Sequence, residues 1–291
     1  MKTHFKICLM IALLLAVVLL GCGMAAKPAP TPDVPADVPD GAPSAPVAPA
    51  TEASSPEITI PRSLAPDLPD TKTVTVTTAD EFIAALDSNV TIRIETELLD
   101  LSTASGYGEA FGDHYRWARE FDGPTLEIHD VENLRIIGSG KDSTVIQATP
   151  RYADVLRFVD CKNLALFDFT AGHLKEAPGS CSGMVLTFRK CSEVSIRACG
   201  LFGCGVMGIW AFNCIGFQVR ETEIYECSSL AATIDNCRDV SFEGCSIYDC
   251  DDGNNKMDLF NCSVTWNGET LRSGSHWFDH GACTGGAAWD W

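Results

Sequence analysis

Residues 204–226, CGVMGIWAFNCIGFQVRETEIYE, and residues 227–249, CSSLAATIDNCRDVSFEGCSIYD, repeat one pattern of residue types with a period of 23. The same pattern begins one unit earlier at Cys181, and a further unit begins at Cys250. Within each unit, apolar residues recur at every second position in three short runs. Successive side chains of a strand point to opposite faces, so this alternation predicts three strands per unit and no helix.

Three short strands per unit predict a coil that directs one set of side chains inward and stacks on the coil above. The expected fold is therefore all-β, a right-handed parallel β-helix with coils of about 23 residues. Leucine-rich repeats have a similar period, but each contains one strand followed by a helix or looser turn. The three alternating runs favour the β-helix over that alternative.

Length and charge restrict the class of protein. The chain has 291 residues and a formal net charge of -18, with 46% hydrophobic residues. A phosphate backbone would be repelled by this charge, which argues against nucleic acid as a partner. About 220 residues would remain after a leader and a linker, a length that suits one solenoid domain with a continuous core.

The N-terminus has the pattern of an export signal. Lys2 and Lys6 precede the apolar run Ile7 to Leu20, whose 14 residues are too few to span a bilayer comfortably. The junction Leu19-Leu20-Gly21-Cys22 resembles the lipobox of bacterial lipoproteins, which implies cleavage after residue 21 and lipidation of Cys22. An ordinary secretory signal is the alternative. We expect a lipid anchor that holds the protein on the extracytoplasmic face of the cell membrane.

Residues 22–72 are expected to form a disordered stalk. Twelve of the 15 prolines lie between Pro28 and Pro69, and such a density favours extended backbone without ladder hydrogen bonds. The folded domain is expected over residues 73–291. Near its start, Thr78-Ala79-Asp80-Glu81 matches a capping box, which predicts a short helix with Phe82, Ile83 and Leu86 on one side. This helix would cap the open end of the solenoid.

Two insertions interrupt the alternation, at residues 101–124 and 171–183. From about residue 73 to 265, the chain resembles the right-handed parallel β-helix superfamily, which includes pectate lyases and related polysaccharide-acting proteins. The segments Pro150-Arg151-Tyr152-Ala153, Thr170-Ala171-Gly172-His173 and Phe202-Gly203-Cys204-Gly205 are similar to a bacterial group within it. The resemblance implies the fold but does not specify an activity.

Most cysteines after Cys22 fall in columns of the repeat: Cys181/204/227/250, Cys161/191/214/237/262 and Cys199/245, with Cys283 outside them. Stacked coils lie about 4.7–4.9 Å apart, so neighbours could form disulfides. The favoured interpretation is a ladder of inward thiols that pack as small apolar groups. No Cys-x-x-Cys pair is present, and we expect no metal site; His173 near Cys181 is interpreted as a hydrogen-bonded loop histidine.

The first strand of each unit presents two outward columns: Glu127, Arg157, Thr187, Trp210, Thr233 and Asp258 in one, and His129, Val159, Arg189, Phe212, Asp235 and Phe260 in the other. The candidate ligand-binding residues are Arg157, Arg189, Trp210 and Phe212, which combine cations with stacking surfaces for a sugar chain. The two insertions could form walls beside this face. Alternatively, they could cover the aromatic residues.

Catalysis has weaker support. Pectate lyases use clustered acids to hold calcium, whereas the acids of these columns are scattered. Asp235 and Asp258 lie on a diagonal of neighbouring coils, a relation that separates side chains by about 7–8 Å. That spacing falls within the range of about 6.5–9.5 Å between the two carboxyl groups of inverting glycosidases.

The sequence therefore predicts a surface lipoprotein whose β-helix domain binds a polymer, most plausibly a glycan, without a cofactor. A polysaccharide lyase or glycoside hydrolase is the first alternative. A structural surface protein without enzymatic activity is the second.

Overall fold

The computed structural model describes residues 71–174, 182–203, 206–250 and 256–273, together with the backbone of two further strands, Ser275–Phe278 and Ala287–Asp290. All of these residues belong to Pro61–Trp291, the second of two units into which the chain divides. The predicted leader 1–21, the lipidation residue Cys22 and the stalk up to residue 70 lie outside the described residues. So do Cys181, Cys204, Cys283 and the predicted turn at 251–255.

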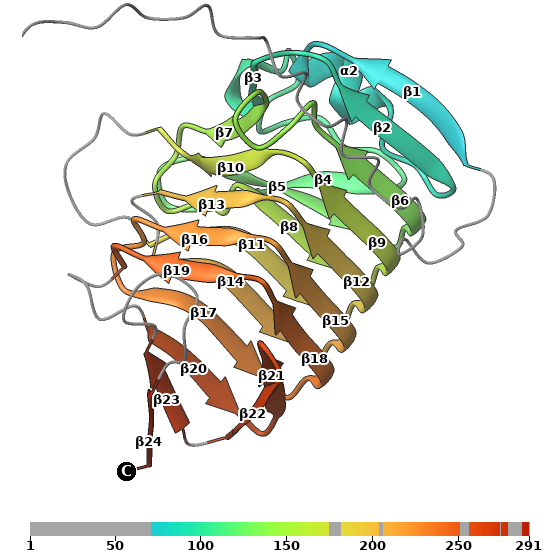
Figure 1. The fold of residues 1–291 in the computed structure, drawn as a ribbon. Helices are drawn as coiled ribbons and strands as arrows, with labels where there is room; N and C mark the ends of the chain where they lie inside the picture. Colours follow the sequence, from blue (N-terminus) through green and yellow to red (C-terminus); the bar gives the residue numbers. More distant parts are fainter. Residues whose placement is uncertain are drawn as a thin grey trace, which may run out of the picture. The chain divides into compact units, whose positions relative to one another are not determined.

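The fold is all-β, and most of its strands pair in parallel within three sheets (Figure 1). Between residues 124 and 266, the strands visit the three sheets in turn in chain order, and parallel pairing joins equivalent strands of neighbouring coils. We call three such successive strands, one in each sheet, a coil. This arrangement is consistent with a β-helix and agrees with the three alternating runs of the repeat.

The three sheets are defined by their strands. The first sheet contains β4 (Tyr115–Arg119), β5 (Pro124–His129), β8 (Leu156–Val159), β11 (Met184–Arg189), β14 (Met207–Phe212), β17 (Leu230–Asp235), β20 (Lys256–Phe260), β23 (Ser275–Phe278) and β24 (Ala287–Asp290). The second contains β1 (Lys72–Val76), β2 (Val90–Ile94), β6 (Glu132–Ile137), β9 (Lys162–Phe167), β12 (Ser192–Arg197), β15 (Ile215–Arg220), β18 (Arg238–Glu243), β21 (Ser263–Trp266) and β22 (Glu269–Arg272). The third contains β3 (Leu98–Asp100), β7 (Val145–Ala148), β10 (Thr170–His173), β13 (Gly200–Phe202), β16 (Glu223–Tyr225) and β19 (Ser246–Tyr248).

The register follows the repeat where the repeat is regular. Leu186 pairs with Ile209, and Ile209 pairs with Ala232, a step of 23 residues each time. The preceding step is longer, because Leu156 pairs with Leu186, 30 residues later. The predicted coil length of about 23 residues thus holds for the middle coils, while the earlier coils carry extra residues in the turns between their strands.

Inward side chains form columns that run through the stack. Phe158 and Phe188 pair in one such column of the first sheet, with ring centroids 5.2 Å apart, and Phe188 packs on Phe217 of the second sheet at 5.1 Å. All three rings are fully buried. Burying one such ring contributes about 1.5–3 kcal/mol. Because each ring packs on the rings of adjacent coils, the core is shared between coils and no coil has a core of its own.

The N-terminal helix forms as predicted. Helix α2 (Ala79–Ala84) begins after Thr78, whose side chain accepts a hydrogen bond from the Glu81 amide, while the Glu81 carboxylate accepts one from the Thr78 amide. Phe82, Ile83 and Leu86 are buried. The helix lies beside β1 at one end of the stack (Figure 1), where it covers apolar residues of the first coil. A single 3₁₀ turn, η1 (Leu101–Thr103), follows β3.

Tight turns between strands depend on residues with positive φ. One column of such residues, after the second-sheet strands, contains Asp168, Ala198, Glu221, Gly244 and Asn267, with φ between 45° and 62°. The Ala198 amide donates to the Arg220 carbonyl of the next coil at 3.0 Å, so the turn also joins the ladder. Elsewhere, asparagine side chains form ladders: Asn163 donates to Asn133, and Asn133 donates to Asn89, each at 2.7 Å.

Antiparallel strands close three edges. Insertion 101–124 folds back as β4, which pairs with β5 at the N-terminal edge of the first sheet. At the other end, β22 pairs with β21, and β23 pairs with β20. Edge strands with open backbone groups invite association, and these added strands occupy those groups.

The positive-φ column yields a stability prediction. Ala198 has φ 51°, a conformation that costs an L-residue about 1–2 kcal/mol and costs glycine almost nothing. Gly244 occupies the same column at φ 62°. We expect Ala198→Gly to increase the free energy of unfolding by about 0.5–1 kcal/mol, after the greater entropy of the unfolded glycine chain is subtracted. Chemical denaturation measures this change.

The matched control is Ala118→Gly in β4, where the backbone is extended and glycine gives no relief of strain. This control should lose stability. Equal losses in both variants would contradict a strained turn at Ala198.

Candidate functional site

A groove of about 470 Å³ lies on the outward face of the first sheet. Its lining consists of Val159, Arg189, Lys190, Trp210, Phe212 and Asp235. The register explains this set, since Val159 pairs with Arg189, Arg189 with Phe212, and Phe212 with Asp235 on four successive strands. The predicted outward columns therefore have the predicted neighbours, and three of the four candidate binding residues lie together.

The groove combines a cation with two aromatic rings. The guanidinium carbon of Arg189 lies 5.0 Å from the centroid of the Trp210 ring, within the range of cation–π attraction. The Trp210 and Phe212 rings have centroids 6.5 Å apart and an interplanar angle of 44°. Both rings are half-buried. Such a pair offers a fixed apolar surface flanked by a hydrogen-bond donor.

Insertion 101–124 does not cover these rings. Its strand β4 extends the first sheet at the edge, and the order β14-β11-β8-β5-β4 places three strands between β4 and the strand that carries Trp210. Of the second insertion, residues 175–181 lie outside the described residues.

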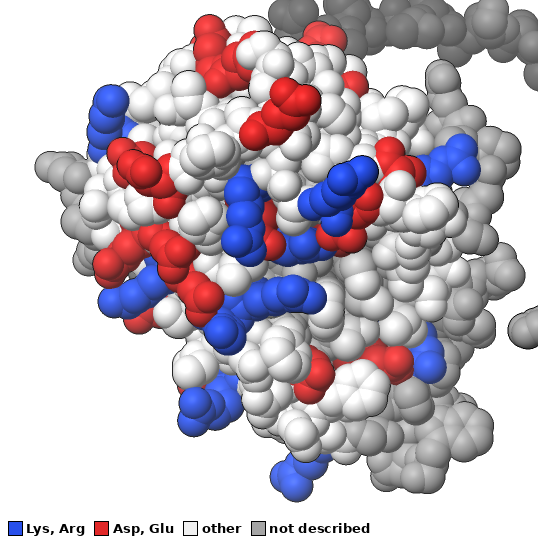
Figure 2. Space-filling view, turned by 180° about the vertical axis from the view of Figure 1, so that it is seen from behind, with Lys and Arg blue, Asp and Glu red and all other residues white. Residues whose placement is uncertain are grey.

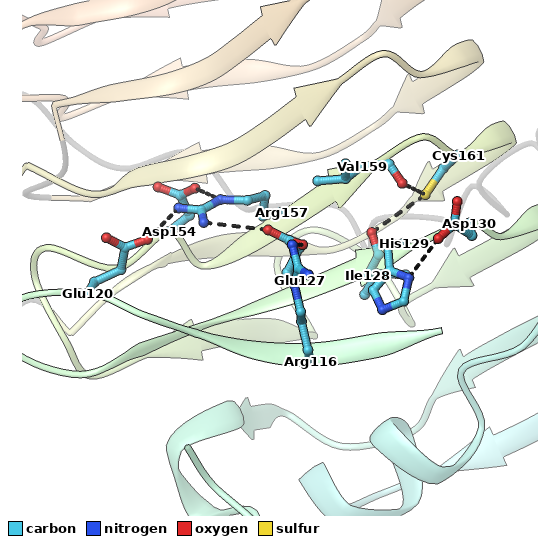
Figure 3. Close-up of polar contacts among 10 residues, drawn as sticks. All are labelled: Arg116, Glu120, Glu127, Ile128, His129, Asp130, Asp154, Arg157, Val159 and Cys161. Carbon is cyan, nitrogen blue, oxygen red and sulfur yellow. Dashed lines mark hydrogen bonds and ion pairs between the residues drawn. The ribbon is translucent and has the colours of Figure 1, made fainter. Parts of the chain in front are cut away.

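Arg157, the fourth candidate, lies in a separate cluster of charges (Figure 3). Its guanidinium contacts Asp154 and Glu120 at 2.8 Å each and Glu127 at 3.7 Å, and Glu127 also pairs with Arg116 at 2.5 Å. The Arg157 side chain is only 13% exposed, and those of Glu127 and Asp154 are 5% and 4% exposed. Burial disfavours the charged form of Arg157, but the carboxylates outweigh it and raise its pKa.

This cluster joins the N-terminal insertion to the sheet. Glu120 and Arg116 come from the β4 hairpin, Glu127 from β5 and Arg157 from β8. Glu127 and Arg157 are neighbours in one predicted outward column, but Glu120, Asp154 and Arg116 were not predicted as their partners. Asp154 also accepts a hydrogen bond from the Met184 amide at 3.0 Å, which joins the cluster to the start of β11. Arg157 is occupied by these contacts, which suits a structural role.

The two candidate catalytic acids have different surroundings. Asp235 lines the groove, while Asp258 forms an ion pair with Lys256 at 3.4 Å. Asp235 pairs with Phe260 and Asp258 with Thr233, so the two acids lie on the predicted diagonal of adjacent strands. The groove thus brings Asp235 together with Arg189 and Trp210, and it adds Lys190, which is not among the residues predicted from the sequence. Lys190 lies 4.0 Å from Asp160.

Charged side chains of both signs are visible on one face of the molecule. Figure 2, the view from behind Figure 1, shows Lys and Arg side chains across the middle of the surface with acidic side chains around them. Cations are therefore accessible on a protein whose formal net charge is -18.

The cysteines of the described residues lie mainly in the core. Eight are buried and Cys262 is half-buried, and all nine are free thiols in the structure. Their sulfur atoms donate to backbone carbonyls, as in the contact from Cys237 to Ala211 at 3.5 Å. Burial raises the pKa of Cys199 to about 12, which keeps that thiol neutral and unreactive.

His173 is fully buried in β10, where its Nε2 lies 2.8 Å from the Ala153 carbonyl oxygen. Burial lowers its pKa, so the neutral ring is the stable form, and Nε2 carries the proton that it donates. The predicted hydrogen bond is confirmed, but the predicted loop is wrong, because His173 ends strand β10, which occupies the first residues of the expected insertion 171–183. The described residues contain no cluster of three or more His, Cys, Asp and Glu side chains placed to hold a metal ion.

No protein-family model, curated protein or solved structure matches this chain. Within the part of the chain that the structure describes, no helix has the length and apolar character needed to cross a membrane.

The separation of Arg157 from Arg189 yields a prediction. Arg157→Gln would leave the buried carboxylates of Asp154 and Glu127 short of a cation, and breaking such a buried pair costs about 3–5 kcal/mol. We expect a large fall in the urea midpoint of unfolding.

Arg189→Gln serves as the control, because that residue makes a cation–π contact worth about 0.5–1 kcal/mol at the surface. Equal effects of the two substitutions would contradict the assignment of Arg157 to a structural cluster.

Proposed function

We propose that the protein is a surface lipoprotein whose right-handed parallel β-helix domain binds a glycan in the groove on its first sheet. The observation that carries the proposal is the groove itself, in which Trp210, Phe212 and Arg189 are brought together by consecutive strands. Its volume of about 470 Å³ lies within the range of sites for small ligands or short polymer segments.

The chemistry of the lining suits a sugar. A pyranose ring has an apolar face of C–H groups, which packs well on an aromatic ring, and a rim of hydroxyl groups. Arg189 and Lys190 can donate hydrogen bonds to these hydroxyls, and the Asp235 carboxylate can accept from them. A pocket with an apolar floor and a few directed polar groups has the general character of a ligand site.

The repetitive backbone suits a polymer. Outward positions recur on each coil at the strand spacing of about 4.8 Å, so a chain lying along the stack meets similar backbone geometry at each step. The sequence resemblance to polysaccharide-acting β-helix proteins agrees with this proposal.

An enzyme that cleaves polysaccharide is the alternative. Asp235 in the groove favours it, because a carboxylate beside a bound sugar can act as a general acid or base. A glycosidase would also need a second carboxyl group at a defined distance. Asp258 is the nearest candidate on the predicted diagonal, and its ion pair with Lys256 makes it a less available partner.

Glycan-array binding and titration calorimetry on residues 61–291 test the binding site. We expect Trp210→Ala and Phe212→Ala to weaken binding at least tenfold, the loss typical of a central aromatic contact. Phe121→Ala is the matched control, since that ring is 87% exposed at the β4–β5 turn, outside the groove lining. Loss of binding in all three variants, or in none, would exclude the groove as the site.

Assays of product release, binding and protein capture on the same protein distinguish the three alternatives. Release of reducing ends or unsaturated products that stops in Asp235→Asn would establish the enzyme. Binding that survives Asp235→Ala and Asp258→Ala without product release would establish a binding protein. Capture of protein partners with no affinity for any polysaccharide would indicate a structural surface protein.

Membrane attachment is the second part of the proposal and rests on the Gly21-Cys22 junction. Without an inserted helix, stable membrane anchoring takes two signals, such as two acyl chains. A lipidated N-terminal cysteine would carry the lipid. We expect Cys22→Ser to move the protein from the membrane fraction to the soluble fraction after export. Retention of this variant in the membrane would contradict the lipid anchor.

A further inference from the structure

A second hollow lies at the C-terminal end of the second sheet, separate from the groove. Its volume is about 640 Å³, and strands β18, β21 and β22 contribute to it. Its polar lining includes Arg238, Arg272, Asn261 and Thr270. Half-buried Cys262 lines the same space, and its thiol donates to the Ile234 carbonyl oxygen at 3.3 Å.

The two arginines flank one strand. The order β18-β21-β22 places β21 between the strand that begins at Arg238 and the strand that ends at Arg272. Arg272 pairs with Ser263, the first residue of β21. Val240 pairs with Val264, so counting back two positions places Arg238 level with Cys262. The backbones of the two arginines are two strand spacings apart, about 10 Å. Both long side chains can therefore reach a single group that lies between them.

The charge of the hollow differs from that of the chain. Both arginines are exposed, and among the described residues neither forms an ion pair. Asp239 is the one carboxylate in the lining, so the balance is positive in a chain of net charge -18. Arg157, by comparison, is neutralised by three acids.

We propose that this hollow binds an oxyanion carried by a larger molecule, such as a sulfate, phosphate or carboxylate group on a sugar. Guanidinium groups form paired hydrogen bonds with these anions, and hydroxyl and amide groups such as those of Thr270 and Asn261 complete their coordination. The volume exceeds the needs of a bare inorganic anion and leaves room for the attached group. This site is independent of the glycan groove.

The Cys262 thiol provides a local readout. The other eight described cysteines are buried, so Cys262 is the most accessible thiol among them. Neutral iodoacetamide should alkylate it, and mass spectrometry of the Cys262 peptide gives the rate. The probes are inorganic phosphate and glucose 6-phosphate, with chloride keeping the ionic strength constant. We expect saturable slowing by both, with tighter binding of glucose 6-phosphate.

The variants Arg238→Gln and Arg272→Gln should each weaken this protection at least tenfold, as expected for the loss of a charge-assisted pair. Their melting temperatures should match the parent, because both side chains are exposed. Arg93→Gln is the control: its exposed arginine lies on β2, at the other end of the second sheet, and protection should be unchanged.

Equal affinity for the two probes would assign the site to the free anion. Protection that does not saturate beyond the effect of chloride, or that persists in Arg238→Gln and Arg272→Gln, would overturn the proposal. Failure of glycan binding at Trp210 would leave this result unaffected, since Trp210 does not line the hollow.

Discussion

Parallel backbone pairing between successive coils is the interaction on which the rest of this structure depends. A strand within a coil finds no partner in its own coil, because the three strands belong to three different sheets. Its amide and carbonyl groups are satisfied only by the coils before and after it. Each coil is therefore stable only within a stack, and any turn that shifts the register would move every outward side chain to a wrong position.

The turns maintain that register. Residues with positive φ recur at equivalent points of successive coils, and several of their amides donate to the next coil. Glycine and asparagine tolerate this conformation, whereas Ala198 and Glu221 adopt it at a cost. The shared aromatic core offsets that cost, and the register that results brings Arg189, Trp210 and Phe212 together on one outward face.

The sequence predicted the parts of the structure that follow from periodicity. The alternating runs identified the strands, the capping box located α2, and the 23-residue step placed Phe212 between Arg189 and Asp235. It could not predict what depends on long-range contacts of irregular segments. The hairpin β4 brings Glu120 to Arg157 and Arg116 to Glu127, and nothing in the local pattern of residues 101–124 specifies that approach. The hollow between Arg238 and Arg272 likewise depends on β22 folding back in the antiparallel sense, after the repeat has ended.

The antiparallel strands that close the two ends of the stack do not depend on how many coils lie between them. Strand β4 requires only β5 as a partner, and β22 requires only β21. The coils between them are joined by equivalent turns at a 23-residue step. Duplication or deletion of one such unit would leave both ends with their partners and change the length of the outward face by one strand spacing, about 4.8 Å. Gene rearrangement could thus change the length of the outward face in steps of one coil without any change to the strands that close its two ends.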